Sequence, residues 1–417
     1  MTAVIALIDG EHHPSAVRDA LARLADSHDV RGVVFCGGQE KLTADVLPDP
    51  ARHYGMEVTV DPDRARALRG LAASHAGVTA VVDLADEPVL DARGKLELAC
   101  TALDLGLRYI GADFELRPPV LEPLDFDGPR LAVIGTGKRT GKTAVCGHWA
   151  SLLREHGRRP LVIAMGRGGP AEPQTADPAM TAAELLAIAR SGRHAASDYL
   201  EDAVIAGVPT VGCRRVGGGL AGGCVESNVA AGARLAIAQN PGTLLFEGSG
   251  AALPPVQVDA TICVVGSREG ALEHLGPYRL LRSALALVTP EDPALPRDVA
   301  RWCPGRVIRI GLAPEAVEPV PAGARVAFFT TGPGELSGLE PVLVSRNLAR
   351  RGDLERDLQR AVAEGCDVYV TELKAAAVDT VAEAAERAGA RLVWARNRPY
   401  ARDSGEDLDA ALLALTP

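Results

Sequence analysis

Short apolar runs alternate with longer amphipathic segments over roughly the first 125 residues. Runs of this length, bounded by polar turns, are typical of buried strands, whereas the longer segments have helical periodicity. Strands that alternate with helices favour a parallel sheet. We therefore predict that residues 1–125 form an N-terminal Rossmann-like α/β domain. The predicted strands are Val4–Ile8, Gly32–Phe35, Val78–Leu84 and Tyr109–Ile110, and the predicted helices are Ala16–Leu24, Arg64–Ala73 and Gly94–Leu103.

A proline-rich segment, Arg117–Leu124, interrupts this alternation and is predicted to be a linker. The alternation resumes after it, so residues 126–417 are predicted to form a second, larger α/β domain with a mainly parallel sheet. Residues 325–417 either complete that sheet or form a separate C-terminal lobe. The strands predicted after the linker are Leu131–Ile134, Pro160–Ala164, Thr210–Val211, Leu244–Glu247, Ala260–Val265, Leu285–Val288, Val307–Ile310, Val326–Thr330, Val368–Thr371 and Arg391–Trp394, with a helix over Ala375–Ala388.

The strand at Leu131–Ile134 leads directly into a glycine-rich turn that ends in Gly-Lys-Thr. Such a turn directs backbone amides and a helix N-terminus at an anion, which is how a P-loop holds ATP. Lys142 is predicted to contact the β- and γ-phosphates and Thr143 to ligate Mg²⁺. The leading glycine stands one residue further from Gly141 than in the usual spacing, so the loop is predicted to be longer. The predicted nucleotide-binding residues are Gly135, Gly137, Thr140, Gly141, Lys142 and Thr143.

A second buried strand ends in an acidic residue, Glu247, followed by Gly-Ser-Gly. Parallel strands bring their carboxyl ends to the same edge of a sheet, so Glu247 is expected near the turn. A carboxylate there suits Mg²⁺. We predict Glu247 as a metal ligand together with Thr143, with Asp198 or Asp202 as the next choices.

Basic residues flanked by glycine follow two further strands, at Gly166–Pro170 and Gly212–Gly219. A guanidinium offers a planar pair of donors to phosphate, and glycine lets the ligand approach the backbone. We therefore predict that Arg167, Arg214 and Arg215 lie in loops and bind a polyanionic substrate.

The charge balance excludes some classes of partner. The 417 residues include 44 basic and 54 acidic side chains, a net charge of −10 that argues against binding to nucleic acid or to an anionic membrane surface. No apolar run approaches membrane-spanning length. The eight cysteines are dispersed, and the N-terminus has the character of a strand rather than a signal peptide, so a cytoplasmic protein with reduced thiols is expected.

Several segments together resemble the cyclic 2,3-diphosphoglycerate synthetase family, and the likeness covers nearly the whole chain. A more distant resemblance, in the turn and in Glu-Gly-Ser-Gly, is to dethiobiotin synthetase. The segments that carry the first resemblance are Ile8–His12, Asp83–Asp91, Gly135–Thr143, Ala164–Pro170, Ser197–Asp202, Gly212–Gly223, Phe246–Gly250 and Thr371–Asp379.

The resemblance implies a ligase that uses ATP to close 2,3-diphosphoglycerate into a cyclic phosphoanhydride, with release of ADP and phosphate, and it implies a homodimer. Under this hypothesis Lys138, Arg139 and Lys142 stabilise transition-state charge. His12 is the candidate substrate contact from the N-terminal domain. Lys374, also a candidate for substrate binding, and Asp379 come from the family-like motif alone, without a derived role.

Two other functions remain open at this stage. One is a P-loop kinase or ligase that acts on another polyanionic metabolite. The other is a nucleotide-driven switch of the partitioning kind, which predicts a metal-binding Cys or His cluster or a membrane-associating helix, and neither is evident in the sequence.

Overall fold

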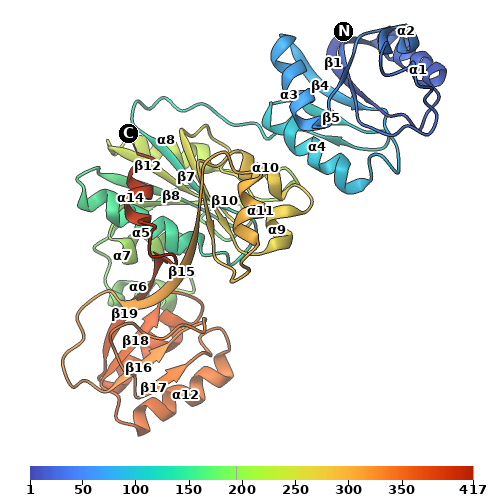
Figure 1. The fold of residues 1–417 in the computed structure, drawn as a ribbon. Helices are drawn as coiled ribbons and strands as arrows, with labels where there is room; N and C mark the ends of the chain where they lie inside the picture. Colours follow the sequence, from blue (N-terminus) through green and yellow to red (C-terminus); the bar gives the residue numbers. More distant parts are fainter. Residues whose placement is uncertain (194, 417) are drawn as a thin grey trace.

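The computed structural model describes residues 1–193 and 195–416. Figure 1 shows three bodies that follow one another along the chain, with the N-terminal body connected to the middle one by an extended segment. Within the described residues the strands form two sheets flanked by helices, and most neighbouring strands are parallel. The predicted α/β class with mainly parallel sheets is confirmed.

The N-terminal sheet has the strand order β3-β2-β1-β4-β5-β6 and is parallel except for the β5–β6 pair. Strands β1 and β4 lie in its centre, and their apolar residues are almost entirely buried. The elements are β1 (Thr2–Ile8), α1 (Pro14–Ser27), β2 (His28–Phe35), α2 (Pro50–Tyr54), β3 (Val58–Val60), α3 (Arg64–Ser74), β4 (Val78–Asp83), α4 (Ala92–Asp104), β5 (Arg108–Ile110) and β6 (Glu115–Leu116).

The middle body contains one half of the second sheet, in the order β11-β10-β8-β12-β7-β13-β14-β15, with β9 paired to β10. Its central strand β7 therefore has β12 and β13 as neighbours. Its elements are β7 (Arg130–Gly135), α5 (Lys142–Glu155), β8 (Pro160–Gly166), β9 (Gln174–Ala176), α6 (Ala182–Arg190), α7 (Asp198–Ala206), β10 (Thr210–Val216), β11 (Glu226–Ser227), α8 (Val229–Ile237), β12 (Thr243–Glu247), β13 (Ala260–Val265), α9 (Arg268–Leu272), α10 (Gly276–Leu281), β14 (Leu285–Val288), α11 (Leu295–Ala300) and β15 (Arg306–Ala316).

The C-terminal body continues the same sheet through an antiparallel pairing of β15 with β19, which runs from Ile310 opposite Ala401 to Ala316 opposite Ala395. Beyond this pair the order is β19-β18-β16-β17, all parallel. The helix predicted over Ala375–Ala388 begins two residues later and opens with a π-helical segment. The elements are β16 (Val326–Phe329), β17 (Leu343–Ser345), α12 (Arg351–Ala363), β18 (Val368–Glu372), η1 (Ala377–Ala382), α13 (Glu383–Ala388), β19 (Arg391–Ala401) and α14 (Leu408–Leu413).

Helix α4 of the N-terminal body packs against α10 of the middle body. At this contact the Cys100 Sγ lies 3.8 Å from the carbonyl oxygen of His274. The extended segment pairs with the middle body through an isolated bridge between Glu122 and Val256. The N-terminal sheet is thus fixed to the side of the middle body at α10.

The turn between β7 and α5 requires a glycine at its last position. Gly141 precedes the helix with a φ of 97°, and a Cβ at this position would lie 3.1 Å from the Leu312 side chain. Glycine alone adopts this conformation without strain. The helix that follows is anchored by fully buried residues, among them Trp149. In the part of the chain that the structure describes, no helix is long and apolar enough to cross a membrane.

Candidate active site

The glycine-rich turn lies at the floor of a cleft of about 1110 Å³ between the middle and C-terminal bodies. Strands β7, β8 and β12 end at this cleft from one side, and the segments after β16 and β18 line it from the other. The lining residues include Lys138, Arg139, Thr140, Gly141, Lys142, Thr143, Arg167, Asp198, Glu247, Gly250, Thr331, Gly332, Glu372, Lys374 and Asn397.

Lys142 is folded over its own loop. Its Nζ donates to the Gly137 carbonyl oxygen at 2.7 Å and lies 3.4 Å from the Thr140 Oγ1. Burial lowers the pKa of Lys142, because the interior disfavours its charge. The neighbouring carboxylate of Glu247 opposes that effect. A bound polyphosphate would oppose the effect of burial, because its negative charge favours the protonated lysine.

Glu247 ends β12, directly beside β7, and accepts a hydrogen bond from the Thr143 Oγ1 at 2.6 Å. The two residues predicted as metal ligands are therefore brought together. Burial, and then the charge of Asp198, raise the pKa of Glu247 to about 7. A cation bound at this position would counteract both effects, because it favours the charged carboxylate.

Helix α7 directs three carboxylates toward the same region, because Asp198, Glu201 and Asp202 are three and four residues apart and share one face. Asp202 is 1% exposed, and its two carboxylate oxygens accept no hydrogen bond from any described residue. Burial, and next the charge of Glu247, raise its pKa. A buried carboxylate without a donor indicates a place for a cation.

Lys374 reaches this acidic region from the C-terminal body. Its Nζ lies 3.0 Å from the Glu201 Oε1. The carboxylate of Glu201 raises the pKa of Lys374, so the lysine stays charged. Burial raises the pKa of Glu201 to about 7, and Lys374 only partly counters that effect.

The prediction that Arg214 and Arg215 lie in a loop is wrong, because β10 extends through both residues to Val216. Hydrogen bonding to β8 and β11 overrides the turn tendency of the adjacent glycines. Consecutive strand residues face opposite ways, so the two arginines cannot bind one ligand together. The Arg214 guanidinium lies 4.0 Å from Glu226, and neither Arg214 nor Arg215 is among the residues that line the cleft.

Arg215 and Arg167 instead converge on Gly250. A Cβ on that glycine would lie 2.6 Å from an Arg167 Nη2 and 3.2 Å from an Arg215 Nη2. Arg215 is 7% exposed, and its Nη2 donates to the Ser249 carbonyl oxygen at 2.8 Å. Its buried Nε has no acceptor among the described residues. Two neighbouring guanidinium groups with an unused buried donor could hold an anion.

His12 lies in the N-terminal body, just after β1, and is not among the residues that line the cleft. Its Nδ1 is 2.8 Å from the buried Asp9 carboxylate. The same oxygen accepts a hydrogen bond from the Glu11 amide. In this structure His12 therefore closes the turn after the first strand. Asp379 pairs with Arg351 inside the C-terminal body.

Sequence reasoning missed two features of the site. Arg279 is 4% exposed and donates to the carbonyl oxygens of Ala251 and Leu220, so it ties together the two glycine-rich loops beside Arg215. The segment after β16, Thr330–Gly334, lines the cleft opposite the P-loop. A strand followed by Gly-Pro-Gly could have indicated this segment as part of the site. Arg279 lies within an apolar helix, and no sequence pattern there indicates a role in the site.

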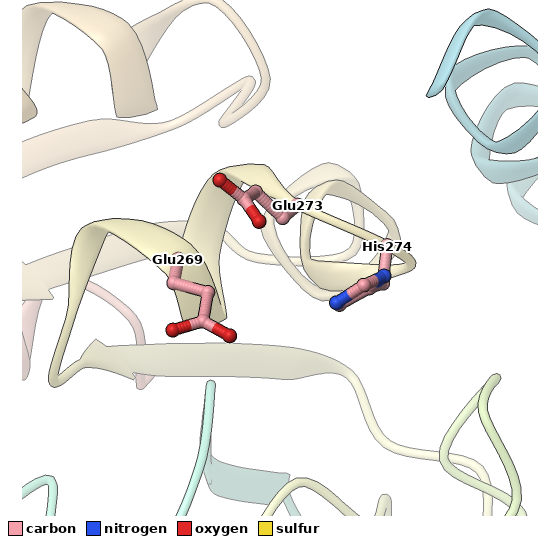
Figure 2. A group of neighbouring side chains, drawn as sticks. All are labelled: Glu269, Glu273 and His274. Atoms are coloured by element: carbon pink, nitrogen blue, oxygen red, sulfur yellow. The ribbon is translucent and has the colours of Figure 1, made fainter. Parts of the chain in front are cut away.

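Figure 2 shows a separate group, Glu269, Glu273 and His274, whose ligand atoms lie within 4.8 Å of one another. All three side chains are exposed, beside α9 and away from the residues that line the cleft. Exposed acidic groups of this kind are common without a metal, so the group is not assigned a function.

Three family models match the chain, and each describes a domain of cyclic 2,3-diphosphoglycerate synthetase. The N-terminal domain matches residues 3–117, the P-loop domain residues 130–300 and the C-terminal domain residues 317–398. Among solved structures, the ATP complex of LpxK from Aquifex aeolicus aligns at 12% identity with a TM-score of 0.40, over 72% of this chain and 91% of that one.

Curated relatives named cyclic 2,3-diphosphoglycerate synthetase align over almost their whole length. The protein from Rubrobacter xylanophilus is 43% identical over 98% of this chain and 96% of its own. Those from Thermococcus gammatolerans and Methanothermobacter thermautotrophicus are 38% and 35% identical, each over 99% of this chain and 96% and 95% of their own. The chain therefore belongs to the cyclic 2,3-diphosphoglycerate synthetase family.

Proposed function

We propose that this chain uses ATP to close 2,3-diphosphoglycerate into cyclic 2,3-diphosphoglycerate, releasing ADP and phosphate. The observation that carries the proposal is the pair of anion-binding elements in one region. The P-loop turn around Lys142 lies in the same cleft as Arg167 and Gly250, where the buried guanidinium of Arg215 also converges. A kinase for a neutral substrate would need only the first of these elements.

In the first step one substrate phosphate attacks the γ-phosphorus of ATP, and ADP leaves. Lys142 would bind the β- and γ-phosphates, because its Nζ already lies over the loop that holds them. Lys138 and Arg139 line the cleft beside it and would stabilise charge that develops on the transferred group.

In the second step the other substrate phosphate attacks the phosphorus of the activated one and expels inorganic phosphate. Two phosphate dianions on one small molecule repel each other, and this repulsion opposes ring closure. Arg167 and Arg215 would offset it by binding both groups at once, since their guanidinium groups already approach the same glycine.

We also propose that the site uses Mg²⁺, held by Thr143, Glu247 and Asp202. The unpaired, buried oxygens of Asp202 and the contact between Thr143 and Glu247 support this set, because hard oxygen donors are what the ion prefers. When bound, Mg²⁺ would neutralise charge on the β- and γ-phosphates.

Residues 1–125 are proposed as an N-terminal α/β domain and 126–417 as the nucleotide-binding and catalytic part, with 325–417 as a C-terminal lobe. A cytoplasmic location is supported by eight cysteines, all without disulfide partners.

A homodimer is supported by three exposed apolar residues around the β10–β11 loop, Val216, Leu220 and Val225. Light scattering coupled to gel filtration is expected to give twice the 43.5 kDa chain mass.

The reaction itself can be followed by ³¹P NMR of ATP and 2,3-diphosphoglycerate incubated with the protein. We expect a cyclic phosphoanhydride signal, and Lys142→Ala should reduce its rate of formation by about 10²-fold or more, because a phosphate-binding cation is lost. Lys41→Ala removes a lysine of the N-terminal body and serves as the control. A linear phosphorylated product from the wild type would replace this proposal with a kinase.

The metal site predicts that Glu247→Gln and Asp202→Asn each shift the Mg²⁺ concentration for half-maximal activity upward by about tenfold or more, because an anionic ligand becomes neutral. Magnesium titrations at saturating ATP measure this shift. Asp19→Asn, an exposed change on α1, is the matched control. Titrations that coincide with the wild type would assign the metal to other residues.

The arginine site predicts different results for two adjacent residues. Arg215→Ala should raise the KM for 2,3-diphosphoglycerate by about tenfold or more with little change in the KM for ATP. Arg214→Ala should raise the KM for 2,3-diphosphoglycerate by a smaller factor. Arg215→Lys should restore binding only in part, because an ammonium lacks the planar pair of donors. A larger effect from Arg214→Ala would contradict the placement of the substrate beside Gly250.

A further inference from the structure

Lys374 is one of the cations that the C-terminal body contributes to the cleft around the P-loop, together with Arg402. It follows β18, and its side chain extends into the cleft that Lys142, Thr143 and Glu247 also line. Its side chain is 33% exposed, and Glu201 is the one carboxylate within 4.0 Å of it among the described residues. An ammonium group has three protons to donate. One faces Glu201, which leaves two for a ligand in the cleft.

The backbone holds this lysine in a fixed orientation. Leu373, before it, is fully buried, and Ala375, after it, has a φ of 48°. This left-handed conformation is unfavourable for an alanine and persists only where the surrounding structure enforces it. The chain therefore turns sharply at Lys374, and the side chain is presented to the cleft from a rigid base.

Glu201 lies on α7, in a smaller pocket that Thr143 and Lys374 also line, and its side chain is 13% exposed. Its helix neighbours Asp198 and Asp202 face the region of Glu247, whereas Glu201 is paired with the incoming lysine. A lysine has four rotatable bonds, so without a partner its ammonium would sample many positions. The paired carboxylate restricts it to one.

We propose that Glu201 is a positioning residue that holds the Lys374 ammonium against the transferring phosphoryl group, so that the ATP site is complete only when the C-terminal body is in place. Lys374 touches the phosphate oxygens and supplies positive charge there, and Glu201 acts through Lys374 alone. The inference rests on the proposed function, because it takes ATP and a phosphorylated substrate as the ligands of the cleft.

A double-mutant cycle tests this role, with kcat for cyclic product measured by ³¹P NMR and ATP binding measured by calorimetry. Lys374→Met should lower kcat by about 10²-fold or more. Glu201→Gln, which leaves the lysine but removes its charged partner, should lower kcat by about tenfold with little change in ATP affinity. The double variant should match Lys374→Met within about twofold, because Glu201 has no effect once its partner is gone.

Glu386→Gln is the matched control. Glu386 pairs with Arg190 at 2.6 Å across the same two bodies, but that ion pair is about half exposed. The same chemical change there should leave kcat within about twofold of the wild type. Equal losses in Glu386→Gln and Glu201→Gln would show that both act by loosening the contact between the bodies, and the inference would then be wrong.

Two further outcomes also overturn the inference. One is an unchanged kcat in Glu201→Gln, and the other is a loss of kcat from Glu201→Gln that is as large in the Lys374→Met background as in the wild type. If Glu201→Gln alone fails to fold, kcat of the double variant, which lacks the whole pair, is compared with kcat of Lys374→Met. A difference of more than about twofold between them would contradict the inference. Absence of cyclic product from the wild type would instead contradict the proposed function.

Discussion

Three carboxylates and two lysines lie buried or half-buried in one small region, and the need to balance their charges determines how the site is built. Removing an ion from water costs several kcal/mol unless a partner of opposite charge replaces the lost hydration. Glu201 has such a partner in Lys374, and Glu247 receives a hydrogen bond from Thr143. Asp202 has neither. Asp202 is therefore a buried carboxylate that no side chain of the described residues neutralises, and a bound cation would be favoured beside it.

The parallel sheet explains why residues so far apart in the sequence meet. Strands β7, β8 and β12 are neighbours, and each delivers its carboxyl end to the same edge. The P-loop follows β7, Arg167 follows β8 and Glu247 ends β12. Helix α7 packs against β8 and contributes its carboxylates to the same region. Each group is held by regular structure, which keeps its position fixed without a bound ligand.

Much of this could be predicted from the sequence. The order of strand, glycine-rich turn and helix located Lys142 and Thr143, and a buried strand ending in an acid located Glu247, because both signals are local. The direction of Arg214 and Arg215 could not be predicted, since it depends on whether β10 continues past Val211, and that is decided by pairing with distant strands. Lys374 was found only by resemblance, because its partner Glu201 is 173 positions away and no local pattern relates the two.

The pairing of β15 with β19 has a consequence for how the chain folds. Strand β15 is an edge of the middle half of the sheet until β19 covers it, and β19 lies near the end of the sequence. During synthesis the nucleotide-binding half therefore presents an open strand edge, which other chains could pair with, until β19 has left the ribosome. Helix α14, which packs on α5, arrives later still. The order of synthesis thus makes completion of the nucleotide-binding core a late event.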